Sequence, residues 1–373
     1  MPRVLLAFEP PDGGVAEHVA QLALRLAAHG FEPEVAGPAE ALVYPRLAGA
    51  GVPVHRLPLV RDLRDLRSHR AAVGAIERLL AGGAFDVVHA HSARAGVLAR
   101  IAAARQGTPA VYSPHCFPFV GPVPLARRAV ATAVERRLGR RTAAIICACE
   151  AERRWALIRA IGPPERLHLV YYGVEACPDG TPADPVLSDL QRAGPLAGAV
   201  SVLRHQKRLD LLLGATPAVL ERVPDARVAI VGDGPLRDQL HDRAQRLGLD
   251  RDERFAFLPF EPPAARYLKA LDVYVLPSAW EALPIGALEA LACGVPQIAT
   301  DVEGTGEAVQ HDRTGLLLPP DAGGLAESMV ALLGDERRRR AMSEASRARQ
   351  RERFGVERMI AETARVYEGA LAG

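Results

Sequence analysis

The sequence lacks any long apolar run. No segment reaches the ~20 consecutive apolar residues that span a bilayer as a helix. The N-terminal stretch MPRVLLAFEPPDGG has an apolar part that is too short for the core of a secretory signal, and acidic residues and prolines interrupt it at once. These absences argue against a membrane-spanning protein and predict a cytoplasmic one.

An excess of one charge sign is also absent, since 46 Lys and Arg face 44 Asp and Glu, a net charge of +2. We therefore expect no nucleic-acid partner, and any basic surface must be local. Cysteine is scarce: the five residues are scattered and odd in number, which fits a reducing compartment. Cys147 and Cys149 alternate along an expected strand without further ligand-type neighbours, so a metal site there is disfavoured.

Short apolar runs alternate with helical patterns in both halves of the chain, which indicates parallel sheets covered on both faces. In the first half the expected strands are RVLLAF, FDVVHAH, AVYSP, AAIICA and ERLHLVYYG. In the second half they are GAVSVL, RVAIVG, RFAFL, DVYVL, VPQIAT and GLLL. A chain of 373 residues is too long for one ordinary core and suits two.

We predict an α/β protein of two Rossmann-like, doubly wound domains that face a central cleft. Residues 1–176 form the first domain and 198–353 the second. Residues 177–197 are rich in Pro, Gly and Asp and are expected to be a linker. Residues 354–373 form a last helix, which is expected to pack back on the first domain.

Two glycine-containing turns follow expected strands and precede expected helices. Gly14 follows Gly13 in PPDGGVAEH, where free N–H groups can meet an anion or a hydroxyl-rich ligand, although a plain tight turn explains the pair equally well. Gly232 and Gly234 lie in VGDGP, which lacks dinucleotide-binding spacing and the Lys-Ser/Thr of a P-loop. This turn indicates only a nearby phosphate or ribose.

Cations and histidines follow other strands. Arg204 and Lys207 in VLRHQKRLD can face a diphosphate, and a solvated basic loop is the alternative. His115 ends a first-domain strand, where a packed or capping histidine is the alternative. His89 and His91 suggest a metal, but no carboxylate or cysteine with ligand spacing accompanies them.

The stretch WEALPIGALEALACGVP places two carboxylates around one helix. Glu281 lies in the loop before the helix, and Glu289 lies about two turns further along it. Without further information, Glu281 is a helix-end charge favoured by the dipole and Glu289 is an exposed helix residue.

Seven segments in register resemble the retaining glycosyltransferases of family 4, which have the GT-B fold. They are GGVAEHV, VHAHSARAGVLARIAA, VYSPHCF, LRHQKRLDLLLGA, VAIVGDGPLRDQL, LPSAWEALPIGALEALACGVPQIATD and GEAVQHDRTGLLLPPDAGGLAESMVALL. The resemblance covers nearly the whole chain, so it implies the fold and the activity together.

The resemblance implies a role for each matching residue in the second domain. Glu281 hydrogen-bonds the donor sugar, and Glu289 holds the ribose of the nucleotide. Lys207 neutralises the leaving diphosphate. Arg204 is given the same role, although the family's arginine usually stands at the position of Val202. The remaining donor contacts are expected from Gly232, Gly234 and the backbone N–H groups of Leu283, Ile285 and Gly286.

In the first domain, the resemblance places His115 beside the reacting centre and gives Gly14 a close approach to donor and acceptor. Several positions depart from the family pattern. Val202 replaces an arginine and Tyr172 an asparagine, and Glu303 stands where glycine is common. Further departures are Cys149 for a serine and EALPIG for the more frequent Glu-Gly-Phe-Gly, which alters the expected sugar pocket.

The implied reaction is retaining transfer of a sugar from a nucleotide-diphosphate-sugar, with UDP as the expected nucleotide, to a hydroxyl acceptor. The acceptor is a lipid-linked glycan or a small-molecule glycoside. No metal or cofactor is expected, because fixed cations face the diphosphate and no Asp-x-Asp motif ends a strand. The alternatives are a nucleotide-sugar epimerase of the same fold and a partner that binds nucleotide sugar without turnover.

The segment PLARRAVATAVERRLGRR carries six arginines and one glutamate, Glu135. Val130, Val134 and Leu138 recur at helical spacing, and this stripe is expected to pack on the sheet. Because family relatives often use lipid-linked acceptors, the arginines from Arg127 to Arg141 are a candidate contact with the anionic inner face of a membrane.

Overall fold

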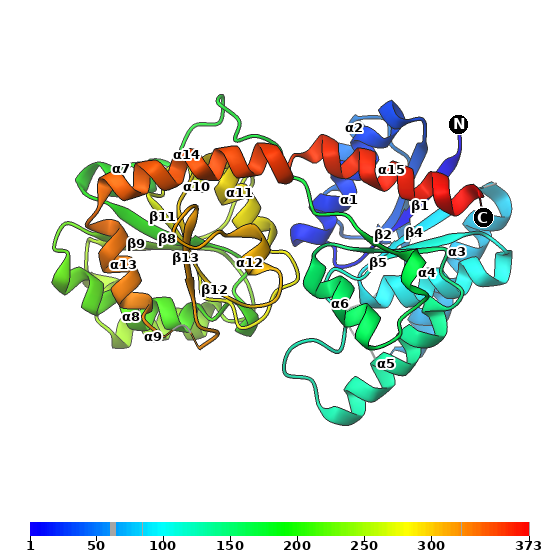
Figure 1. Ribbon diagram of the computed structural model, residues 1–373, viewed down its shortest axis with the longest axis horizontal. Helices are drawn as coiled ribbons and strands as arrows, with labels where there is room; N and C mark the ends of the chain where they lie inside the picture. The colour runs from blue at the N-terminus through cyan, green and yellow to red at the C-terminus, as the bar shows by residue number, and fades with distance from the viewer. Residues whose placement is uncertain (60–64, 84, 322, 373) are drawn as a thin grey trace. The chain divides into compact units, whose positions relative to one another are not determined.

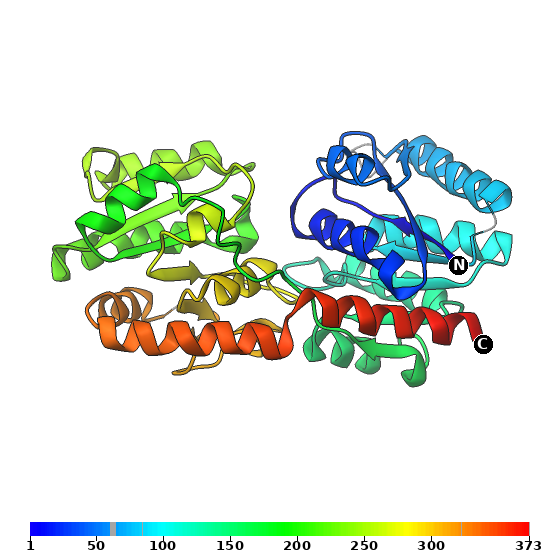
Figure 2. The ribbon, with the colours of Figure 1, turned by 90° about the horizontal axis from the view of Figure 1, so that it is seen from above.

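The computed structural model describes residues 1–59, 65–83, 85–321 and 323–372. The chain divides into two compact units (Figures 1 and 2). Unit 1 comprises Met1–Gly173 and Val356–Gly373, and unit 2 comprises Val174–Gly355. None of the described helices combines the length and the apolar character that crossing a bilayer requires.

Unit 1 is built on a parallel sheet with the strand order β3-β2-β1-β4-β5-β6-β7. The strands are β1 (Arg3–Ala7), β2 (Glu32–Pro38), β3 (Val54–Leu57), β4 (Val87–His91), β5 (Ala110–Ser113), β6 (Ala144–Cys147) and β7 (Leu167–Leu169). The helices are α1 (Gly13–Arg25), α2 (Tyr44–Gly49), α3 (Leu66–Gly83), α4 (Ala93–Gln106), α5 (Leu125–Gly139), α6 (Glu150–Ile158) and α15 (Val356–Ala372). Short 3-10 turns cover Leu26–His29 and Pro164–Arg166.

Alternate residues of the strands enter two different apolar layers, as a doubly covered sheet requires. Val4 and Leu6 of β1 pack in a layer with α1, α2 and α15, whereas Leu5 and Ala7 pack in a layer with α3 and α4. All four side chains are fully buried.

The last helix, α15, belongs to the core of unit 1. Tyr367 is fully buried, and its ring meets Phe31 edge-on at a centroid distance of 5.4 Å. The Tyr367 hydroxyl lies 2.6 Å from His89 Nδ1 on β4. The helix therefore completes the layer that covers α1 and the centre of the sheet.

Unit 2 repeats this architecture with the parallel strand order β10-β9-β8-β11-β12-β13. The strands are β8 (Leu196–Val200), β9 (Arg227–Val231), β10 (Phe255–Leu258), β11 (Val273–Leu276), β12 (Gln297–Thr300) and β13 (Gly315–Leu318). The helices are α7 (Pro185–Ala193), α8 (Leu209–Arg222), α9 (Arg237–Arg246), α10 (Ala265–Leu268), α11 (Ile285–Cys293), α12 (Thr305–Ala308), α13 (Leu325–Leu333) and α14 (Glu336–Arg353). Short 3-10 turns cover His205–Lys207 and Leu249–Arg251.

One face of this sheet is covered by α8, α9 and α13, whose leucines share a core with the strands. Helices α10, α11 and α14 lie on the other face (Figure 1). Both orders reverse beside the first strand of the unit, between β1 and β4 and between β8 and β11. Such reversals open a crevice at the carboxyl ends of the strands, where ligands of this fold class bind.

The expectation that residues 177–197 are a linker is wrong in its second half, which contains α7 and the start of β8. Asp184 caps α7 by accepting hydrogen bonds from the N–H groups of Val186 and Leu187 at 3.1 and 3.2 Å. Pro185 occupies the first helical position, which suits its fixed φ. The Asp-Pro pair therefore begins a helix here and does not indicate a loop.

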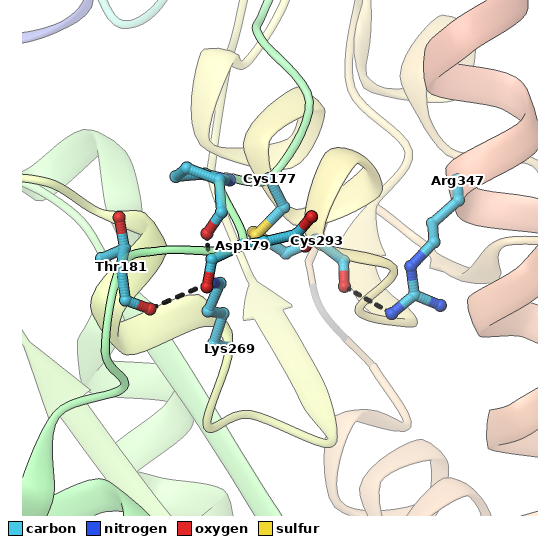
Figure 3. The surroundings of a disulfide bond; sticks show 7 residues. Cys177, Asp179, Thr181, Lys269, Cys293 and Arg347 are labelled. Carbon is cyan, nitrogen blue, oxygen red and sulfur yellow. Dashed lines mark hydrogen bonds between the residues drawn. A yellow bond between two sulfur atoms is a disulfide. The ribbon is translucent and has the colours of Figure 1, made fainter.

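A disulfide joins Cys177 to Cys293 at the end of α11, with the Cα atoms 4.8 Å apart (Figure 3). Lys269 secures the same segment because its ammonium donates to the carbonyl of Thr181 at 2.9 Å and also reaches the carbonyl of Asp179. Arg347 of α14 donates to the Cys293 carbonyl at 3.1 Å. The expected reducing compartment implies free thiols, which this disulfide contradicts. Nothing in the sequence indicates the pairing, because 116 positions separate the two residues.

Helix α5 contacts its neighbours through charge and not through the expected apolar stripe. Val130 and Val134 are 64% and 37% exposed, whereas Glu135 is only 1% exposed. The Glu135 carboxylate accepts hydrogen bonds from Arg100 at 2.8 Å and from the Tyr112 hydroxyl at 3.1 Å. A buried carboxylate needs such partners, so the ion pair fixes which face of α5 points inward.

Candidate functional site

Most residues predicted to carry chemistry lie in loops at the carboxyl ends of strands, in two groups, whereas Ile285, Gly286 and the half-buried Glu289 lie on α11. In unit 2 they follow β8, β9 and β11, around the reversal of strand order. In unit 1, Gly14 follows β1 and His115 follows β5. Each group is described within its own unit.

Glu281 is the centre of the group in unit 2. Its side chain is almost fully buried, and its Oε1 atom accepts hydrogen bonds from Lys207 Nζ at 2.6 Å and from the Ser278 hydroxyl at 2.7 Å. Gln206 holds the same loop, because its amide donates to the Trp280 carbonyl at 2.9 Å. The sequence singled out Glu281 and Lys207 as candidate site residues but did not predict that they contact each other directly.

Helix α11 begins at Ile285, with Pro284 at the N-cap position. The N–H groups of Leu283, Ile285 and Gly286 lie around this first turn, where amides lack intrahelical partners and attract anions. Gly286 is required by close packing, since a Cβ at this position would lie 2.7 Å from the Tyr274 hydroxyl. Burial, and then the charges of Glu289 and Glu281, raise the pKa of the buried Tyr274 hydroxyl.

The glycines after β9 have a packing reason that the sequence alone did not show. A Cβ on Gly232 would lie 2.0 Å from the Ser201 carbonyl, and one on Gly234 would lie 2.7 Å from the Leu203 carbonyl. Leu203 also donates its N–H to the Asp233 carbonyl at 2.9 Å. The turn therefore supports the loop that carries Arg204, whose side chain is exposed.

Four histidines gather in the group of unit 1. His91 Nδ1 lies 2.9 Å from His115 Nε2, and the Tyr172 hydroxyl contacts His115 Nδ1. The His18 ring lies edge-on to His115 at a centroid distance of 5.0 Å. Burial lowers the pKa of His89, His91 and His115 well below the usual value and lowers that of His18 to about 3, which favours the neutral form of the rings.

Three of these rings satisfy the ligand count of a metal site. One nitrogen from each of His18, His91 and His115 lies within 4.8 Å of the other two. His91 and His115 direct their facing nitrogens at each other, however, and among the described residues no Asp, Glu or Cys joins the three rings at ligand distance. The arrangement therefore fits a self-contained hydrogen-bonded cluster better than a metal centre.

Glu152 holds the turn that presents His115. Its two carboxylate oxygens accept hydrogen bonds from the N–H groups of Cys116 and Ala148, both at 2.8 Å. His115 and Cys116 have φ angles of 53° and 90°, a conformation that non-glycine residues rarely adopt. Burial raises the Glu152 pKa to about 7, despite the two backbone hydrogen bonds that lower it.

Gly13 begins α1 with a φ of 77°, and Gly14 follows it in the exposed first turn. The positive φ requires a glycine at the first of the two positions. Nothing within 4 Å would meet a Cβ on Gly13, so backbone conformation and not crowding explains this residue.

Our reading of the sequence missed His18 and Glu152. His18 lies within GGVAEHV, so its place one turn after the paired glycines was the available signal. Glu152 stands three positions after the N-cap residue Cys149, the spacing of a capping box. In both cases the missing information was the neighbouring strand that the side chain faces.

The chain is similar to known proteins over most of its length. Residues 189–349 match the glycosyl transferases group 1 family, and residues 13–173 match the glycosyl transferase 4-like domain. A D-inositol 3-phosphate glycosyltransferase of Nocardia farcinica is 30% identical over 359 residues, which cover 88% of this chain and 79% of that protein. A UDP-Gal:alpha-D-GlcNAc-diphosphoundecaprenol alpha-1,3-galactosyltransferase of Escherichia coli is 28% identical over 271 residues, which cover 70% of this chain and 68% of that protein.

Among solved structures, Anabaena HepE in complex with UDP and glucose superposes with a TM-score of 0.82 at 22% identity, over 99% of this chain and 100% of that one. This likeness concerns the fold. The chain belongs to the group 1, or family 4, glycosyltransferases and has their two-domain GT-B fold.

Proposed function

We propose that this glycosyltransferase moves a sugar from a UDP-sugar to a hydroxyl acceptor and retains the configuration of the anomeric carbon. The observation that supports this most is the Lys207–Glu281 pair, which sits where the loops after β8 and β11 meet the N-terminus of α11. A cation, a carboxylate and free helix amides at one point suit a sugar diphosphate, because each part of that ligand then has a matching partner.

Each residue of the group takes one part of the donor. Glu281, in the loop before α11, binds the sugar hydroxyls. Glu289, which lies on α11, binds the ribose. Lys207 and Arg204 face the diphosphate together with the amides at the start of α11. For His115 and Gly14 of unit 1, the family pattern implies roles beside the reacting sugar and the acceptor.

The chemistry follows from where charge develops. The bond from the anomeric carbon to the diphosphate oxygen breaks, and positive charge grows on the sugar ring as in glycoside hydrolysis. Negative charge grows on the diphosphate, where Lys207, Arg204 and the helix amides stabilise it. The acceptor oxygen attacks the same face, and its proton passes to an oxygen of the departing diphosphate.

No metal ion or cofactor is assigned to this reaction, because fixed cations and amides serve the diphosphate. The sequence contains one Asp-x-Asp motif, Asp250 and Asp252, but it precedes β10 and so lies at the amino end of a strand. Asp252 is also paired with Arg254 at 2.7 Å. This motif is therefore a poor place for a metal-bound diphosphate.

UDP as the nucleotide rests on two comparisons. The galactosyltransferase of E. coli is named for UDP-Gal, and HepE was solved with UDP and glucose. The first test is thermal stabilisation by UDP, GDP, ADP and dTDP, followed by NMR of the product formed from the matching donor. An anomeric configuration opposite to that of the donor would contradict the retaining mechanism.

A membrane contact through the Arg127–Arg141 region is part of the proposal. Leu125 and Val130 on α5 are 80% and 64% exposed. Leu125 also lines a groove of about 570 Å³, together with Arg128, Arg136, Arg137, Arg140 and Arg159. Apolar side chains flanked by arginines suit an anionic membrane surface. Flotation with vesicles should require anionic lipid, and equal recovery with neutral vesicles would remove this part of the proposal.

A further inference from the structure

Glu303 combines a rare backbone conformation with an unusual residue type. Its φ angle is 33°, in the left-handed region that favours glycine. The family pattern commonly has glycine at this position, so the chain keeps the conformation and adds a side chain to it. Strain of this kind persists where the surrounding structure compensates for it, and it is frequent in functional loops.

The Glu303 side chain is directed at the loop that carries Glu281. Its Oε2 atom accepts a hydrogen bond from the Glu281 N–H at 2.9 Å. Glu281 itself is only 5% exposed, and its carboxylate is occupied by Lys207 and Ser278. Two carboxylates therefore meet at the loop after β11. Glu281 belongs to this loop, and Glu303, which follows β12, accepts a hydrogen bond from its backbone.

The charges of the two carboxylates are compensated differently. Lys207 is paired with Glu281 at 2.6 Å. Among the described residues, no lysine, arginine or histidine forms an ion pair with Glu303. Burial, and then the charge of Glu281, raise the pKa of Glu303, which is the direction expected for a carboxylate without a cation.

We propose that Glu303 is a specificity-determining residue of the donor-sugar pocket, which admits neutral sugars and excludes sugars that carry a carboxylate. The proposal rests on the proposed function, because it requires Glu281 to bind the donor sugar. A uronate bound there would bring a further negative charge to a half-buried carboxylate that has no cation. A neutral hexose offers hydroxyl donors in its place and meets no such repulsion.

The experiment compares donors that differ only at C6 of the sugar. The dissociation constants of UDP-glucose and UDP-glucuronate, and of UDP-galactose and UDP-galacturonate, are measured for the wild type and for Glu303→Gln and Glu303→Gly. The wild type should bind the neutral member of at least one pair about tenfold more tightly or better, a difference of about 1.4 kcal/mol. Both variants should reduce this ratio severalfold, and UDP itself should bind as before.

Each comparison has a control. Glu303→Gln keeps the length and the acceptor for the Glu281 N–H, so it removes the charge alone, whereas Glu303→Gly also removes the strain. Glu327→Gln makes the same charge change on α13, at a side chain that is 68% exposed, and should leave the ratio unchanged. If UDP binds but the variants keep the wild-type ratio, or the wild type binds the uronates equally well, this inference is wrong and the proposed function stands. If UDP fails to bind at all, the proposed function is wrong and the inference falls with it.

Discussion

Lys207 and Glu281 form an ion pair with Nζ and Oε1 2.6 Å apart, although 74 positions separate them in the sequence. The pair joins the loop after β8 to the loop after β11, on either side of the reversal in strand order. The cation proposed for the diphosphate is therefore held by the carboxylate proposed for the sugar. A donor that binds here must share or replace this contact, which couples recognition of its two halves.

Lys207→Met should weaken UDP binding by about 10- to 100-fold, because a charge-assisted hydrogen bond to phosphate contributes about 1.5–3 kcal/mol. Uridine, which has no phosphate, should bind the variant as it binds the wild type. Calorimetry with both ligands measures the difference. Arg208→Met is the matched control, since Arg208 is adjacent but pairs with Asp210. An equal loss for UDP and uridine would show that the substitution disturbs the pocket as a whole.

Gly286→Ala should destabilise the protein by about 1–3 kcal/mol, because its Cβ would lie 2.7 Å from the Tyr274 hydroxyl and must displace it or the start of α11. UDP affinity should fall as well, since the amides of this turn are the proposed diphosphate contacts. Gly369→Ala on α15 is the control, as nothing lies within 4 Å of the place that its methyl group would take, and alanine is favoured in a helix. Equal melting temperatures for the two variants would contradict the packing argument.

The buried His18 ring should make the free energy of unfolding decrease as the pH falls. Burial lowers its pKa from 6.5 to about 3, so below pH 6.5 the unfolded chain binds a proton that the folded chain refuses. Stability is therefore complete above pH 6.5 and is lost as the pH falls towards 3, by at most about 1.4 kcal/mol per pH unit. His89, His91 and His115 act with the same sign, and Glu152, whose pKa is raised to about 7, acts with the opposite sign.

Comparing the wild type with His18→Phe isolates this one ring. The stability lost between pH 6.5 and 5 should be smaller in the variant, because phenylalanine does not titrate. His311→Gln, at a side chain that is 56% exposed, should follow the wild-type curve. The free energy of unfolding is measured by urea denaturation at each pH. If it fell equally between pH 6.5 and 5 in the wild type and in His18→Phe, the His18 ring would not resist protonation.

Reduction of the Cys177–Cys293 disulfide should destabilise the protein by about 2–4 kcal/mol, because the bond closes a loop across a separation of 116 positions. The double variant Cys177→Ser/Cys293→Ser should melt at the temperature of the reduced wild type and should not respond to reductant. A reductant effect that persists in the double variant would assign the stabilisation elsewhere.

The alternation of strands and helices was predictable in both halves because fully buried parallel strands are continuous apolar runs. Strands β2 and β3 were not predicted, because neither is a continuous apolar run. Glu32, Pro33 and Pro38 interrupt the first, and His55 and Arg56 interrupt the second. β3 is the edge strand of the sheet, where polar residues are tolerated, and β2 lies next to it.

Side-chain partnerships were predictable only in part. Glu281 and Lys207 could be identified from their motifs, but their contact depends on two loops meeting in space. The burial of Glu135 was not predictable, because a glutamate among arginines does not reveal that its partners, Arg100 and Tyr112, lie on other elements. The inward face of α5 was misjudged for the same reason.

The measurement that tests the central claim most directly is the stabilisation of the wild type and of Glu289→Ala by UDP. At 100 times its dissociation constant, UDP should stabilise the wild type by about 2.7 kcal/mol, and most of this gain should disappear in the variant. A 2′,3′-dideoxy UDP should stabilise both proteins equally weakly, because the ribose hydroxyls are the groups that Glu289 is proposed to hold. Undiminished stabilisation of Glu289→Ala by UDP, or none of the wild type, would contradict a donor site at the N-terminus of α11.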